Sequence, residues 1–264
     1  EVIANDILYA DYIIAKALLS NDTKPISEEI FFTKINTRRV NSIRKKISFL
    51  EETLYYPEEV DELAKLLAIS EKLDENQQYL FLALVRRAMI RKLPYSRMNV
   101  PWNQIQQLRD EEYSYRKYKR KRAYHNQSFE SHIIENMEAY NNALFQGKKC
   151  EIHNVDAMKI AKKISNVDII YMDPPYPSTM NNYDAFYGSF DKMFSKKVDH
   201  MDFTNKSTFL KNLEKLIKTL KDKTKYIVLS QNTRVQPSPK EIMKMLSKYG
   251  EVELKEKKHN YQVT

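Results

Sequence analysis

The chain has 264 residues, and 42% of them are hydrophobic, so a large core can form and wholesale disorder is excluded. Lysine and arginine (44) outnumber aspartate and glutamate (35), and the formal net charge of +9 favours a polyanionic partner. The single cysteine, Cys150, excludes an internal disulfide, and no Cys/His cluster has the spacing of a zinc site, so no metal is expected. No apolar run reaches the roughly 18 residues of a membrane span, and no signal peptide is present. We therefore expect a soluble, cytoplasmic protein with no membrane partner.

The first half of the chain is expected to be mainly helical. Residues 2–4 form a short apolar run that ends at Asn5-Asp6, and helical spacing follows over residues 7–19, which predicts a strand, an acidic tip and a helix. Residues 25–93 are expected to be mostly helical, with a helix that starts at Asp74 and ends before Pro94. Residues 94–128 lack apolar periodicity and are dense in Arg, Lys and Tyr, so no helix is assigned there. A helix resumes over residues 130–144, and Gly147 is expected to help end it.

The last part alternates strands and helices in the α/β manner. The predicted elements are a strand at 151–154, a helix at 157–163, a buried strand at 167–172, a helix capped by Ser207, a buried strand at 226–229, a helix from the capping box at Ser238 to Gly250, and an edge strand with Val252 and Leu254. The chain starts and stops without terminating elements, so we expect both ends to be truncations of a longer protein.

The motif Asp173-Pro174-Pro175-Tyr176 follows the strand at 167–172 directly, where ligands bind in open α/β sheets. An exocyclic amine on an aromatic base is a poor nucleophile, because its lone pair is delocalised into the ring. The Asp173 carboxylate and the Pro174 carbonyl can accept its two N–H groups, and the successive prolines hold these acceptors rigid. The Tyr176 ring can stack on a base taken out of a duplex. The alternative interpretation is a Pro-Pro turn without chemistry.

The chain resembles the Dam-like (D12 class) DNA adenine-N6 methyltransferases, and among them the modification methylases of type II restriction systems. The resemblance lies in residues 171–183 with the continuation Phe186-Tyr187-Gly188, in residues 91–99, in the basic segment through Ser128-Phe129, and in residues 261–264. It implies an α/β, Rossmann-like fold that uses S-adenosylmethionine (AdoMet) as methyl donor and double-stranded DNA as substrate. It also implies a cognate restriction endonuclease encoded nearby, without a stable complex.

One feature of the family is missing. Relatives carry a Phe-x-Gly-x-Gly loop that binds AdoMet and precedes the tip matched by Asn5-Asp6, whereas this chain begins after that loop. We therefore expect an N-terminally incomplete sheet with a mostly helical, basic target-recognition insertion. Residues 1–24 would belong to the AdoMet-binding part, residues 25–148 to the helical region with the recognition segment, and residues 149–264 to the catalytic domain.

The resemblance assigns three acidic residues to the cofactor. Asp6 would hold the ribose hydroxyls of AdoMet, with a helix N-cap as the alternative role. Asp156 would lie near the adenine of AdoMet, and a cap on the helix from Ala157 is the alternative. Asp173 is assigned to both the cofactor and the catalytic site.

The remaining assignments concern DNA. Asn232, in Ser230-Gln231-Asn232, would line the target-base pocket, and Tyr183 would stack over the base; a polar turn and core packing are the alternatives. Six basic residues occupy seven positions and would neutralise phosphates, unless they form a solvated face: Arg116, Lys117, Lys119, Arg120, Lys121 and Arg122. Arg97 is an additional expected contact.

Three other functions stay open from the sequence. The substrate amine can be cytosine N4, an RNA adenine or a protein amide, although cytosine enzymes more often carry Ser, and amide enzymes Asn, where Asp173 stands. The chain can be a DNA-binding fragment without catalysis, because the cofactor loop is absent. It can also be a globular protein with a chance motif.

Overall fold

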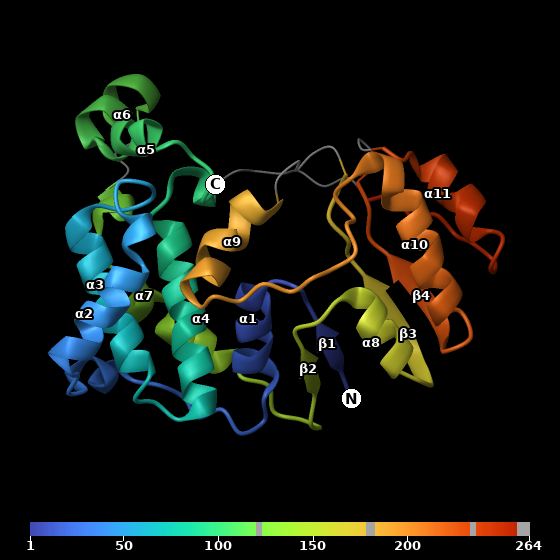
Figure 1. Cartoon of the computed structure of the whole chain (residues 1–264), viewed down its shortest axis with the longest axis horizontal. Coiled ribbons are helices and arrows are strands. Elements are labelled where there is room, and N and C mark those ends of the chain that lie inside the picture. The colour runs from blue at the N-terminus through green and yellow to red at the C-terminus, as the bar shows by residue number, and fades with distance from the viewer. Residues whose placement is uncertain (120–122, 178–182, 233–235, 258–264) are drawn as a thin grey trace. The chain divides into compact units, whose positions relative to one another are not determined.

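The computed structural model describes residues 1–119, 123–177, 183–232 and 236–257, which pack into two compact units (Figure 1). Unit 1 comprises residues 1–4, 8–153 and 185–197, and unit 2 comprises residues 5–7, 154–184 and 198–264. Helices combine with two small sheets, so the mixed α/β class predicted from the sequence is confirmed.

Unit 1 is built around an apolar helical core. Strand β1 (Ile3–Asn5) pairs with β2 (Glu151–His153), and the expected helix after the acidic tip is α1 (Tyr9–Leu19). The other core elements are η1 (Glu28–Phe32), α2 (Thr37–Lys46), η2 (Ser48–Leu50), α3 (Pro57–Ser70), α4 (Glu75–Arg91), α7 (Phe129–Asn142) and α9 (Tyr183–Met193).

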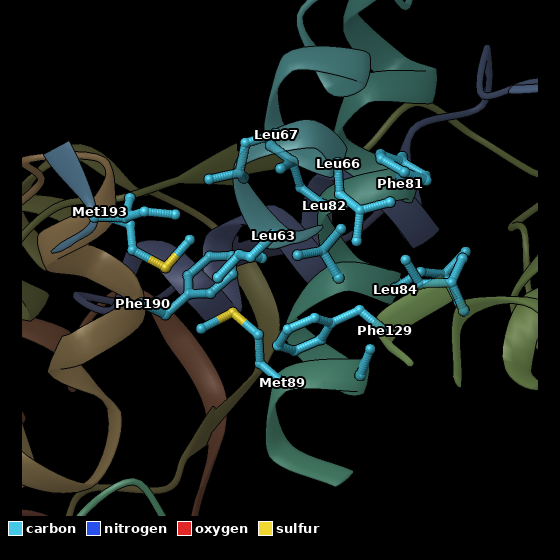
Figure 2. Packing of buried hydrophobic residues seen from close by; sticks show 14 of the residues in the cluster. Leu63, Leu66, Leu67, Phe81, Leu82, Leu84, Met89, Phe129, Phe190 and Met193 are labelled. Carbon is cyan, nitrogen blue, oxygen red and sulfur yellow. The ribbon is translucent and has the colours of Figure 1, made fainter. Parts of the chain in front are cut away.

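Helix α4 lies at the centre of this core. Its side chains from Leu80 to Val85 are all buried, which agrees with an apolar stretch too broad for a surface helix. Asp74 caps it as predicted, because its carboxylate accepts a hydrogen bond from the Gln77 amide (2.9 Å). Figure 2 shows Phe190 and Met193 of α9 in the same cluster as Met89 of α4.

Two short helices occupy the basic region where none was assigned. After η3 (Pro94–Ser96), the chain forms α5 (Trp102–Arg109), α6 (Glu111–Tyr118) and η4 (Ala123–Asn126). Two-turn helices are too short to show periodicity. Asp110 stabilises α6 as its N-cap, accepting from the Tyr113 amide (2.9 Å).

Unit 2 has a parallel strand pair covered by helices on one face. Its elements are α8 (Ala157–Lys163), β3 (Val167–Met172), α10 (Lys206–Leu220), β4 (Thr224–Leu229) and α11 (Pro239–Leu246). Ile170 and Ile227 pair in register on the face that packs against α8, α10 and α11.

The other face of this strand pair is exposed. Ile169, Tyr171 and Tyr226 are 61%, 65% and 67% exposed. The strands are where the sequence predicted them, but the prediction that they are buried is wrong, because helices in the described part of the chain cover only one face.

Several predicted boundaries also need correction. Asn205, not Ser207, caps α10, since its side chain accepts from the Ser207 amide (3.0 Å). Helix α7 ends five residues before Gly147, and α11 ends at Leu246, although its capping box at Ser238 is confirmed. In the described residues 251–257 no strand forms.

A distant carboxylate caps the start of α1. The Asp191 side chain, on α9, accepts hydrogen bonds from the Tyr9 amide (2.7 Å) and the Ala10 amide (3.0 Å). Leu8, at the N-cap position, supplies no side-chain bond. Burial raises the pKa of Asp191, and the two amide bonds oppose that rise. Helix α9 therefore stabilises the start of helix α1.

Replacing Asp191 with alanine removes both bonds and leaves two buried amides unpaired. The free energy of unfolding should fall by roughly 1–2 kcal/mol, measured by denaturant titration with circular dichroism. Asp22→Ala, at an exposed position, is the control and should leave the midpoint unchanged. An unchanged midpoint for Asp191→Ala would contradict the capping role.

Candidate active site and nucleic-acid interface

Parallel pairing brings two polar segments to one edge of the unit 2 sheet. Met172 and Leu229 are partners in the register of β3 and β4. The next residues, Asp173 and Ser230, therefore leave the sheet beside each other, and the Ser230 amide donates to the Met172 carbonyl (2.9 Å). This edge is the carboxyl end of both strands, where ligands bind in open α/β sheets.

The predicted catalytic motif stands at this edge and is not packed in the interior. Asp173 is exposed, while Pro174, Pro175 and Tyr176 are half-buried. The Tyr176 hydroxyl donates to Asp173 Oδ1 (3.4 Å) and lies 3.5 Å from Ser230 Oγ. The motif and the segment after β4 thus share a polar contact.

The segment after β4 carries an unused donor. Gln231 Nε2 is buried and has no hydrogen-bond partner within the part of the chain that the structure describes. Its Oε1 accepts from the Asn232 amide (2.9 Å). An unpaired buried amide is costly unless a ligand or water completes it, so this position can accommodate an acceptor atom.

Amide side chains tie the acidic tip after β1 to the loop after β2. Asn5 exchanges two hydrogen bonds with the Val155 backbone (3.0 and 3.2 Å), and Asn154 donates to the Asp6 carbonyl (2.9 Å). The N-cap position of α1 belongs to Leu8 and not to Asp6, so the capping alternative for Asp6 is wrong. The ribose assignment of Asp6 stays a prediction.

Asp156 is the N-cap of α8, which confirms the capping role offered as its alternative. It is 8% exposed, and its Oδ1 accepts from the Met158 amide (2.9 Å) and the Lys159 amide (3.3 Å). Its Oδ2 accepts from the Met201 amide (2.8 Å). Both carboxylate oxygens therefore bind backbone amides, while the assignment to AdoMet stays a prediction.

Some of the residues predicted to contact DNA lie in the part of the chain that the structure describes, and others lie outside it. Arg97, Arg116, Lys117 and Lys119 are exposed, on or near α6 and η3. Arg120, Lys121 and Arg122 lie outside the described residues, as does the side chain of Tyr183, which begins α9.

Sequence reasoning missed the buried charged groups of unit 1. Glu59, Lys92, Arg109 and Asp191 are each less than a tenth exposed. Their partners lie far away in the sequence, so no local pattern marked them. The available signal was a charged residue next to an apolar stretch, as at Lys92 before Leu93.

The family model for D12 class N6 adenine-specific DNA methyltransferases matches residues 1–245. The chain belongs to this family. It is 41% identical over 271 aligned positions to the type II methyltransferase M2.HphI of Haemophilus parahaemolyticus, and the alignment covers 100% of this chain and 79% of the relative. No solved structure matches the chain significantly.

The sequence left several substrate amines open. Membership of this family identifies N6 of adenine in DNA as the amine that is methylated. The methyl donor of such methyltransferases is in general AdoMet. In the described residues, no group of His, Cys, Asp and Glu side chains is arranged to hold a metal ion. Among the helices described, none combines the length and apolar composition needed to cross a bilayer.

Asp156→Ala removes the α8 cap and the bond to Met201. The free energy of unfolding should fall by roughly 1–2 kcal/mol, because three amides lose their acceptor. Denaturant titration measures the change, and Asp168→Ala, at an exposed position on β3, is the control. Calorimetric titration of the folded variant with AdoMet separates the two roles, since unchanged affinity would leave Asp156 with the cap alone.

Proposed function

We propose that Asp173-Pro174-Pro175-Tyr176 is the catalytic motif of this DNA adenine methyltransferase. The observation that carries the proposal is an exposed carboxylate at the carboxyl end of β3, beside the carboxyl end of β4 and in contact with Tyr176. A carboxylate there is open to a base that enters from solvent.

The proposed mechanism uses two acceptors of the chain. The Asp173 carboxylate accepts one N–H of the adenine amine and the Pro174 carbonyl accepts the other, which draws the nitrogen towards a tetrahedral geometry. The Tyr176 hydroxyl donates to Oδ1 of Asp173, and we assign Oδ2 of the carboxylate to the amine. AdoMet supplies the methyl group. Proline rigidity fixes the acceptors before the base arrives, so positioning provides much of the acceleration.

The target-base pocket is proposed to include the segment after β4. Ser230 lies beside Tyr176, and Asn232 follows the buried, unpaired amide of Gln231. An amide donor next to a stacking ring suits the acceptor nitrogens of a purine. The proposed stacking role of Tyr183 rests on the family resemblance.

The chemistry of the residues present fits AdoMet in part. Its ribose hydroxyls are donors, so a carboxylate at the tip after β1, such as Asp6, suits them. Asp156 suits the cofactor less well, because both of its oxygens already accept backbone amides. We therefore assign Asp6 as the main carboxylate contact and propose that the parallel strands belong to a Rossmann-like sheet.

The basic region around α6 is proposed to bind DNA phosphates. Several other arginines of unit 1 pair with carboxylates, as Arg39 does with Glu71 (2.7 Å). Within the described residues, no carboxylate pairs with Arg116, Lys117 or Lys119, and Lys117 donates to a tyrosine hydroxyl instead. Unpaired cations on an exposed helix are available to neutralise phosphates.

These proposed roles divide the chain into functional regions. Residues 25–148 are proposed as the target-recognition region, and residues 1–24 and 149–264 as the cofactor and catalytic parts. By analogy with the type II relative, we propose that the protein modifies DNA in a restriction-modification system, with a cognate endonuclease encoded nearby.

Asp173→Asn should lower methylation of adenine-containing duplex DNA at least about a hundredfold, because an amide is a weaker acceptor than a carboxylate. AdoMet and DNA affinities, measured separately, should change little. Asp168→Asn, at an exposed position on the strand that precedes Asp173, is the control and should keep wild-type activity. Near-wild-type activity of Asp173→Asn would refute the catalytic assignment.

Neutralising Arg116, Lys117 and Lys119 together to glutamine should weaken DNA binding and flatten its salt dependence. The slope of log K against log salt should become shallower by about 0.9 for each phosphate that the variant no longer neutralises. The control removes three exposed cations from α10, at Lys206, Lys211 and Lys215. Equal slopes in wild type and the α6 variant would show that α6 faces solvent.

A further inference from the structure

A carboxylate buried in unit 1 gathers two buried cations that belong to neither the catalytic nor the phosphate-binding residues. Glu59, in the first turn of α3, is 7% exposed. It accepts two hydrogen bonds from the Arg109 guanidinium (2.8 and 2.6 Å) and lies 2.7 Å from the Lys92 ammonium. Lys92 and Arg109 are 1% and 5% exposed.

The partners of Glu59 also join the two ends of the basic excursion, defined as residues 110–119 and 123–125 of the described chain. Arg109, the last residue of α5, donates through Nε to Asn126 Oδ1 (3.1 Å). Asn126 Nδ2 donates back to the Arg109 carbonyl (3.0 Å). Lys92 donates to the Gln127 carbonyl. Both ends of the excursion, which carries α6, are therefore fastened to one point on α3.

Aromatic rings surround the same cations. The Arg109 guanidinium lies 4.9 Å from the centre of the Tyr56 ring, and the Lys92 ammonium lies 5.0 Å from that of Phe129. Trp102, on α5, packs edge-on against Tyr56 (5.0 Å). Burial alone would raise the pKa of Glu59, but Arg109 and Lys92 hold it below its ordinary value. The three charged groups are thus buried together and paired.

Such a cluster is a poor source of stability. Desolvation of buried charges offsets most of their attraction, and well-packed apolar residues often stabilise a fold more. What a bidentate arginine adds is geometry, because its planar fork accepts few orientations. Here the geometry of the Arg109 side chain constrains the positions at which the excursion starts and ends.

We propose that Glu59, Lys92, Arg109 and Asn126 form a clamp that positions the basic excursion for DNA recognition. Glu59 is then a positioning residue, which acts on DNA affinity without touching DNA. The inference rests on the proposed phosphate-binding role of α6. Several cations must meet successive phosphates together, so a loose excursion pays an ordering cost on binding that a clamped one avoids.

The test uses two variants that release the clamp. Glu59→Gln removes the central charge. Asn126→Ala removes the closing bonds with Arg109 and a 3.4 Å bond to Glu111 from an exposed residue, and so serves if Glu59→Gln folds poorly. The matched control is Glu71→Gln, which breaks an exposed bidentate pair with Arg39 outside the excursion.

Asn126→Ala and folded Glu59→Gln should bind duplex DNA roughly tenfold more weakly, with a salt slope reduced by about 1 for each phosphate that the loosened excursion fails to reach. The KM for DNA should rise while kcat at saturating DNA and AdoMet affinity stay unchanged. Hydrogen exchange should accelerate in residues 110–119. Glu71→Gln should match wild type in each measurement.

The outcomes separate the two proposals. If neutralising Arg116, Lys117 and Lys119 leaves DNA binding unchanged, the phosphate-binding role of α6 is wrong. If that variant loses affinity while Asn126→Ala binds DNA like wild type, the clamp is overturned. Loss of AdoMet affinity in Asn126→Ala would also overturn it, because the damage would not be confined to recognition.

Discussion

The parallel register of β3 and β4 is the constraint on which the candidate active site depends. Because Met172 lies opposite Leu229, the chain must release Asp173 and Ser230 at the same edge. A shift of either strand by one residue would turn its isoleucine, Ile170 or Ile227, away from the helices, so burial of one face fixes the register. The placement of the polar residues at the site therefore depends on the apolar packing behind the sheet edge.

Local chemistry made much of the fold predictable. Strand β3 and helix α8 have the bounds that the sequence predicted, because an apolar run and a capping aspartate mark them. Other features depend on partners that local sequence does not reveal. Helix α5 was not predicted, because its buried Arg109 pairs with Glu59 of α3, 50 residues away in the sequence. The exposed face of β3 was not predicted either, because a continuous apolar run is typical of a strand covered on both faces.

The carboxylates show the same limit at the level of single residues. From the sequence alone, an aspartate at the start of a helix can be either an N-cap or a cofactor-binding residue. At Asp156 the structure shows the N-cap. Asp191 caps a helix 181 residues away, which no pattern could indicate. Asp173 differs from both, since it is exposed and leaves one oxygen without a described partner. Exposure and unused acceptors, more than the residue type, distinguish the candidate catalytic carboxylate.

The lysine and arginine side chains of unit 1 also divide into buried and exposed groups. Arg109 and Lys92 are buried and pair with Glu59, whereas Arg116 and Lys119 are exposed and have no carboxylate partner within the described chain. The two sets cannot exchange roles, because a buried cation without its carboxylate is strongly destabilising, and an exposed cation paired with a carboxylate attracts phosphate poorly. Net positive charge alone therefore says little about where DNA binds. What matters is which cations the fold has already paired with a carboxylate, and Glu59 pairs with those at the base of the excursion while leaving those on α6 available.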